Sequence, residues 1–156
     1  MTGVQTCALP IYRTKLQERV RDLLTVCAAA GSGADPQGPR AFDVTLLGTG
    51  PAGLWALLAA PGAASVIADC NQLDVTSDEA LLAPDLFCPG IRNIGTFQGS
   101  AMLAAPHSLL LHNTGVAFPT DGLRSTYRAL RASDKLRVVA ARLPDEELVK
   151  WMVRVK

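Results

Sequence analysis

A glycine-rich turn is the segment of this chain whose residue types and spacing could most clearly do chemistry. It reads Gly48-Thr49-Gly50-Pro51-Ala52-Gly53 and lies between an apolar strand pattern and an apolar helix pattern. Glycines let a backbone approach a pyrophosphate, and the N–H groups that begin the next helix face such an anion. Asp69 follows Gly48 by 21 residues, near the ~20 expected for a carboxylate that binds a ribose hydroxyl. A nucleotide-binding turn is therefore one hypothesis.

The segment Val44–Leu54 resembles the phosphate-binding turn of FAD-dependent oxidoreductases, Gly-x-Gly-Pro-Ala-Gly-Leu. That resemblance implies an FAD- or NAD-binding fragment of Rossmann type. Two features disagree with it: a helical pattern at Lys15–Ala30 precedes the supposed first strand, and Pro61-Gly62 ends the next helix early. Because no second cofactor motif or redox centre follows in the sequence, we expect the turn to bind neither FAD nor NAD.

The same turn also resembles the Gly-x-Ser-x-Gly nucleophile elbow of the α/β-hydrolase superfamily, in which a strand leads through a sharp turn into a helix. On that motif Gly48 is the first glycine, Gly50 stands in place of the serine and Ala52 replaces the second glycine. The resemblance extends to acetylxylan-esterase and dienelactone-hydrolase relatives through the segments 18–24, 66–69, 86–91 and 103–111. It spans residues 12–156 and implies the C-terminal part of such a fold. We favour it over the flavin hypothesis.

The hydrolase resemblance implies three catalytic positions, and none of them carries its group. Acyl transfer needs a nucleophile, a base and an acid that orients the base. Gly50 has no side chain, and the acid position after strand His107–His112 reads Asn113-Thr114-Gly115, with no carboxylate until Asp121. The loop 141–147, where the histidine is expected, contains none. We therefore assign no catalytic, cofactor-binding or metal-binding residue and predict a degenerate, non-catalytic domain, a pseudoenzyme. An active serine-type esterase with displaced catalytic residues stays open as an alternative.

Other chemically capable side chains have simpler structural explanations. We expect His112 to be solvated or bonded to the backbone, and Asp69 to act as a capping group. Ser100 lacks the strand–turn–helix context of a nucleophile, and Cys70 and Cys88 are expected to be small buried residues. We expect His107 to lie at the surface, and Trp55 and Trp151 to lie in the core.

The composition limits the partners that this chain could have. Fifteen basic and fourteen acidic side chains give a formal charge of +1, and no basic run predicts binding to nucleic acid or to an anionic membrane. The apolar runs are too short to span a bilayer. Four cysteines and two histidines show no metal-ligand spacing and no disulfide framework, so we expect no metal or cofactor.

Strand patterns alternate with helical patterns along the rest of the chain, which predicts an α/β fold: a three-layer sandwich around a mostly parallel sheet. Strands are expected at Phe42–Leu47, Ser65–Ala68, His107–His112 and Leu136–Ala140. Helices are expected at Lys15–Ala30 and Leu54–Ala60, within Phe97–Ala105, after Thr120 with Leu123, Tyr127 and Leu130 on one face, and after Pro144 with Leu148, Trp151, Met152 and Val155 buried. Gly31–Arg40 is expected to be a loop, and residues 70–96 to be irregular.

The N-terminal segment 1–11 resembles the in-frame translation of a sequencing adapter, matching it from Thr2 to Ile11. We therefore interpret residues 1–11 as non-native and residues 12–156 as a truncated α/β-hydrolase-like domain, encoded by a metagenomic, bacterial-type gene fragment. On this interpretation the parent is a larger esterase- or peptidase-like protein. The expected partner of the domain is the missing N-terminal part of that same protein.

Overall fold

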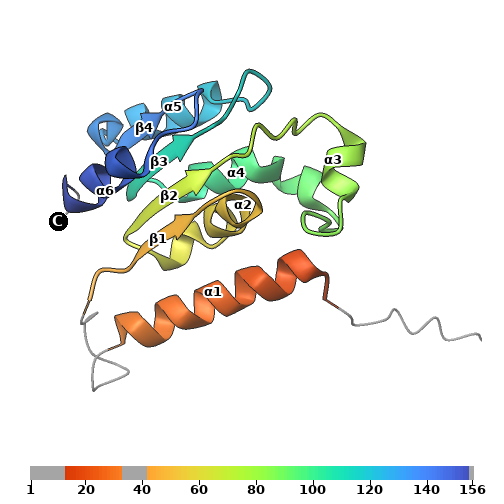
Figure 1. Cartoon of the computed structure of the whole chain (residues 1–156), viewed down its shortest axis with the longest axis horizontal. Helices are drawn as coiled ribbons and strands as arrows, with labels where there is room; N and C mark the ends of the chain where they lie inside the picture. Colours follow the sequence, from red (N-terminus) through yellow and green to blue (C-terminus); the bar gives the residue numbers. More distant parts are fainter. Residues whose placement is uncertain (1–12, 33–41, 155–156) are drawn as a thin grey trace, which may run out of the picture.

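The computed structural model describes residues 13–32 and 42–154. The adapter-like segment 1–11, most of the predicted loop at 31–40, and Val155 lie outside these residues. Four strands form one sheet in the order β1-β2-β3-β4, and all neighbouring strands are parallel. The strands are β1 (Thr45–Gly48), β2 (Ser65–Asp69), β3 (Ser108–His112) and β4 (Leu136–Val138). The predicted parallel α/β architecture is therefore confirmed (Figure 1).

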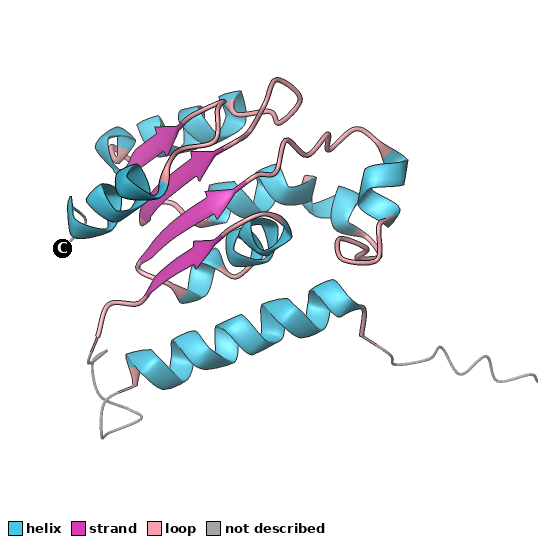
Figure 2. Ribbon diagram, in the orientation of Figure 1, coloured by secondary structure: helices cyan, strands magenta, loops and turns pink. Residues whose placement is uncertain are grey.

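Six α-helices precede, connect or follow the strands in the described part of the chain. They are α1 (Lys15–Gly31), α2 (Pro51–Leu58), α3 (Asp78–Leu82), α4 (Thr96–Leu103), α5 (Asp121–Ala129) and α6 (Asp145–Arg154). Each strand-to-strand connection contains at least one of them, as parallel pairing requires. Figure 2 shows the resulting arrangement of helices around the sheet.

The two faces of the sheet bury different residues, because successive side chains of a strand point to opposite sides. On one face, Val66 and Leu109 pack with the apolar residues of α1, α2, α4 and α5 in the main core. On the other face, Ile67 and Leu110 pack with Leu148 and Trp151 of α6. Strands β2 and β3 are thus covered on both sides, which explains why they read as continuous apolar runs.

Local sequence signals set several element boundaries. Helix α1 begins with a capping box: Gln17 N–H donates to Thr14 Oγ1 at 3.3 Å, and Thr14 N–H donates to Gln17 Oε1 at 2.9 Å. Helix α2 begins with proline at its first position, where the missing N–H costs nothing. The order and type of the predicted long elements agree with the structure.

The boundaries and one buried face differ from the predictions. Strand β1 begins at Thr45, three residues after the predicted start at Phe42. Phe42 lies outside the sheet and is 71% exposed. Helix α2 begins three residues earlier than expected, at Pro51. Leu130, predicted to share a helix face with Leu123 and Tyr127, follows the end of α5 and is 51% exposed, whereas the other two are buried. Apolar character alone did not indicate where backbone pairing stops.

Candidate functional site

The turn between β1 and α2 has the backbone geometry of a strained strand-to-helix connection. Gly50 lies at its tip, directly before α2, with φ 53° and ψ −135°. Residues other than glycine rarely adopt this backbone conformation. A Cβ atom built on Gly50 would meet nothing within 4 Å. The tip of the turn therefore points into open space at the carboxyl end of the sheet.

The flanking glycines are explained by close packing of backbone on backbone. A Cβ on Gly48 would lie 2.6 Å from Gly53 Cα, and a Cβ on Gly53 would lie 2.6 Å from Asp69 N. Both distances are shorter than real Cβ contacts allow. The two glycines let the turn close and let α2 pack against β2, so their presence requires no bound phosphate.

The start of α2 has few donors left for an anion. Pro51 has no N–H, the Ala52 N–H donates to Thr49 O at 3.2 Å, and the Gly53 N–H donates to Gly50 O at 3.0 Å. A helix N-terminus binds phosphate through such free N–H groups. The geometry of this turn therefore disfavours a pyrophosphate at the position that the glycine pattern suggested.

Asp69 lies at the carboxyl end of β2 and joins three segments. Its Oδ1 accepts the Asn71 N–H at 2.7 Å and the Asn113 Nδ2–H at 2.8 Å, and its Oδ2 accepts the Gly50 N–H at 3.2 Å. The side chain is buried. Burial opposes ionisation of Asp69, but the hydrogen bonds from Asn113, Asn71 and Gly50 and the nearby His112 together lower its pKa. Asp69 thus accepts backbone N–H groups, as a capping group does, but it also links three segments of the chain.

Asn113 stands where the hydrolase resemblance expects an acid, and it is part of the same network. Besides donating to Asp69, it accepts the Gln72 Nε2–H on its Oδ1 at 3.1 Å. Its main-chain O accepts the Gln72 N–H at 2.8 Å. The side chains at the ends of β2 and β3 thus bond to one another and to the tip of the turn, and this network contains one carboxylate, Asp69, and no histidine.

His112 is the histidine nearest to this network, and it is buried. Its Nδ1 accepts the Leu143 N–H at 3.3 Å, so the proton of the neutral ring is on Nε2. Nε2 has no hydrogen-bond partner among the described residues. Burial, the largest cause, and the charge of Arg142 lower the pKa of His112, against the opposing influence of Asp69. The imidazole is therefore uncharged at neutral pH, and its backbone bond agrees with the expectation from the sequence.

Within residues 13–32 and 42–154, no side-chain hydrogen bond joins the other candidate nucleophiles to a histidine or a carboxylate. Cys70 is fully buried, and burial together with the Asp69 charge raises the pKa of its thiol to about 12. Ser100 is buried in α4 and donates to Thr96 O at 3.4 Å within its own helix. Cys88 is half-buried and contacts Gln17 Nε2 at 3.8 Å. None of these groups has the activated nucleophile–base pair that covalent catalysis requires.

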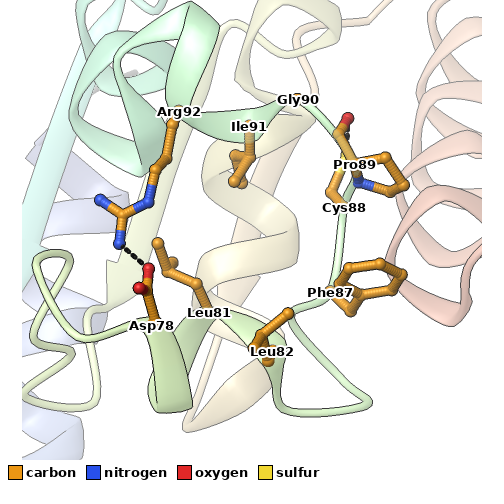
Figure 3. A pocket seen from close by; sticks show the side chains of 9 residues that line it. All are labelled: Asp78, Leu81, Leu82, Phe87, Cys88, Pro89, Gly90, Ile91 and Arg92. Atoms are coloured by element: carbon orange, nitrogen blue, oxygen red, sulfur yellow. Dashed lines mark hydrogen bonds and ion pairs between the residues drawn. The ribbon is translucent and has the colours of Figure 1, made fainter.

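A separate cavity of about 230 Å³ lies near α3, away from the glycine-rich turn (Figure 3). Its lining is largely apolar, with an ion pair between Arg92 and Asp78, 2.5 Å apart, on one side. Both charged side chains are about half exposed or more. The remaining lining residues are Leu81, Leu82, Phe87, Cys88, Pro89, Gly90 and Ile91. Its lining contains one thiol, that of Cys88, and no histidine that could act as its base.

Metal-binding clusters and membrane-spanning helices are both absent from residues 13–32 and 42–154. No group of three or more His, Cys, Asp or Glu side chains in these ranges could hold a metal ion. No helix there is long and apolar enough to cross a bilayer.

Sequence reasoning missed two parts of this site. Pro51 directly follows Gly50, the position that the hydrolase resemblance assigns to the nucleophile, and its lack of an N–H could have been read from the sequence. The bonds between Asp69, Asn113 and Gly50 could not have been predicted, since they depend on the relative positions of three strand ends. Comparison of the chain with protein-family models, curated proteins and solved structures finds no match.

Proposed function

We propose that this chain is a non-catalytic, α/β-hydrolase-like module of a larger esterase- or peptidase-like protein. The observation that carries the proposal is the turn at Gly50. It has the strained strand-to-helix form of a nucleophile elbow, with room for a side chain at its tip, and the tip has no side chain.

A second loss supports the same conclusion. In α/β hydrolases the N–H of the residue after the nucleophile helps to stabilise the oxyanion. That residue is Pro51 here, which cannot donate. Loss of a single oxyanion-hole donor costs about 2.7–4 kcal/mol of transition-state stabilisation in a serine protease. Adding a nucleophile alone would therefore not complete the site.

The acid and base positions also favour a non-catalytic role. The side chain of Asn113 is hydrogen-bonded to Asp69 and Gln72, and the loop after β4 contains no histidine. Asp69, the carboxylate nearest to the turn that a displaced acid would have to be, already accepts hydrogen bonds from Gly50, Asn71 and Asn113. The carboxylate that a serine-type esterase with displaced catalytic residues would need is thus already hydrogen-bonded within the polar network.

The nucleotide-binding alternative is weakened by the same network. A ribose-binding carboxylate must offer free oxygens to the hydroxyls, but both oxygens of Asp69 already accept protein donors and the side chain is buried. If a flavin absorbance band co-purified with the protein, or FAD clearly raised the melting temperature, this alternative would replace the hydrolase-like proposal.

Hydrolysis of p-nitrophenyl acetate tests the proposal directly. We expect the native chain, Gly50→Ser and the double variant Gly50→Ser/Pro51→Ala to show no turnover above a heat-denatured sample. Gly50→Ala is the matched control, because it strains the turn equally without adding a hydroxyl. Saturable turnover by Gly50→Ser but not by Gly50→Ala would contradict the proposal and place His112 within reach of the serine.

A further inference from the structure

The segment 142–154, which contains α6, is joined to the sheet by few hydrogen bonds. Within the described residues, the backbone bonds between β3 and the chain after β4 end at Ala141, whose O accepts the Asn113 N–H at 3.0 Å. The next bond along the chain is made by a side chain: the Leu143 N–H donates to His112 Nδ1 at 3.3 Å. Ala141 is therefore the last backbone anchor, and His112 holds the start of the segment that follows.

The packing of this segment on the sheet is equally limited. Its buried contacts form a cluster of four residues, separate from the main core: Ile67, Leu110, Leu148 and Trp151. Within this cluster the Trp151 Nε1–H is buried without an acceptor among the described residues, which opposes the packing. An ion pair between Arg137 of β4 and Glu147 of α6, at 3.4 Å, adds little because both side chains are a third or more exposed. Such a helix opens at a lower free energy than the strands that it covers.

Protonation of His112 removes the hydrogen bond that holds the segment. The neutral ring accepts the Leu143 N–H at Nδ1, but an imidazolium donates at both nitrogens, so two donors would meet there. Turning the ring over gives the same result. The side chain is 1% exposed and points to the same face of β3 as Leu110, which α6 covers. The charged ring can therefore reach water on that face only if the segment moves away.

The charged groups around His112 come from β2 and from the segment itself. Burial is the largest cause that shifts the pKa of His112, and it lowers it. Asp69, beside His112 in the sheet register, opposes this shift, but both of its oxygens already accept other N–H groups. Arg142 lowers the pKa further. Asp145 and Glu146, at the start of α6, are exposed to solvent.

We propose that His112 and the segment 142–154 form a pH-sensitive switch, in which protonation of His112 releases the segment while the four strands stay paired. Release uncovers Ile67 and Leu110, an apolar surface that α6 covers at neutral pH. The closed form disfavours the proton, so its stability is complete above the ~6.5 of a free histidine and decreases as the pH falls below that value. The switch goes beyond the non-catalytic role proposed above and does not depend on it, since it requires only the contact between His112 and the segment.

Amide hydrogen exchange of the full chain, corrected for the intrinsic effect of pH on exchange, tests the switch. We expect the α6 amides to lose protection by about tenfold for each pH unit below ~6.5, because one proton is bound on opening. The β2 and β3 amides should stay more protected than those of α6 at each pH, because they require global unfolding. His112→Asn offers an acceptor oxygen near the position of Nδ1 that does not titrate, so its α6 protection should not depend on pH. His107→Asn is the matched control, because His107 is exposed, and it should keep the native behaviour.

Four results would overturn the proposal. Equal protection of α6 and of the β2 and β3 amides would mean that the segment and the sheet unfold together. Protection of α6 that does not change with pH in the native chain would mean that no proton controls it. A pH dependence that persists in His112→Asn would assign the proton to another group. The chain has two histidines, so His107→Asn decides even if His112→Asn does not fold: loss of the pH dependence in His107→Asn would assign the effect to the wrong histidine.

Discussion

Changing Asp69 to asparagine should destabilise the fold more than any other single-atom exchange at the strand ends. The variant keeps the shape of the side chain but replaces one acceptor oxygen by an NH₂ donor. If the remaining oxygen stays with Asn71 and Asn113, the NH₂ group faces the Gly50 N–H, and two donors then meet in a buried position. Both surviving hydrogen bonds also lose the negative charge of their acceptor.

The expected size of the effect follows from these three bonds. A buried donor left without an acceptor costs about 1–3 kcal/mol. A charge-assisted hydrogen bond is roughly twice as strong as a neutral one, so the other two bonds lose about 0.5–1 kcal/mol each. We expect Asp69→Asn to lower the free energy of unfolding by about 3 kcal/mol. For a chain of this length that corresponds to a decrease in Tm of about 9 °C.

Urea denaturation at neutral pH, followed by circular dichroism, measures this difference. Asp74→Asn is the matched control, because Asp74 also accepts hydrogen bonds, from the Thr76 N–H at 2.8 Å and the Thr76 hydroxyl at 2.6 Å. Those bonds are local and exposed to solvent, so we expect the control to lose much less stability. A loss in Asp69→Asn no larger than in Asp74→Asn would refute the importance of the network.

The pH dependence gives an independent check. Because the folded-state pKa of Asp69 is lowered, its ionisation stabilises the folded protein at pH values above the unfolded-state pKa of ~3.9. This stabilisation is lost as the pH falls through the folded-state pKa, where the native carboxyl also becomes neutral. The stability gap between native chain and Asp69→Asn should therefore narrow progressively in acid. A gap that stays constant under acidification would contradict the assigned role of the charge.

Three further outcomes are expected. Gly53→Ala should lower the free energy of unfolding by about 3 kcal/mol or more, because its Cβ meets the Asp69 backbone. Gly50→Ala should lower it by about 1–3 kcal/mol, from backbone strain alone. Equal losses in the two variants would contradict this ranking. In the native protein a thiol reagent should modify Cys88 well before Cys70, whose pKa of about 12 keeps it a thiol, and rapid labelling of Cys70 would show that β2 opens. Thermal melts with and without FAD should coincide, and a reproducible upward shift would count against the hydrolase-like proposal.

The sequence was sufficient to predict the order of the elements. Apolar runs at 65–68 and 107–112 predicted buried parallel strands, and both lie in the middle of the sheet, covered on two sides. The capping box at Thr14 and the proline at the first position of α2 depend on nearest neighbours only, although the predicted start of α2, Leu54, lies three residues after the observed one. The absence of a hydroxyl at Gly50 and of an N–H at Pro51 can likewise be read from the residues, because each is a property of one amino acid.

Only the tertiary structure decided how the polar residues are used. Asp69 and Asn113 are 44 residues apart in sequence, and their bond exists because β2 and β3 are paired in register, with Asp69 beside His112. The pairing of β1 with β2, in which Gly48 lies beside Ala68, places Gly50 next to Asp69 and so turns a predicted capping group into a link between three segments. The position of β1 at the edge of the sheet and the position of α1 beside it also depend on how whole elements pack. Local sequence determines which elements form, whereas the contacts between their ends arise only when long-range packing brings them together.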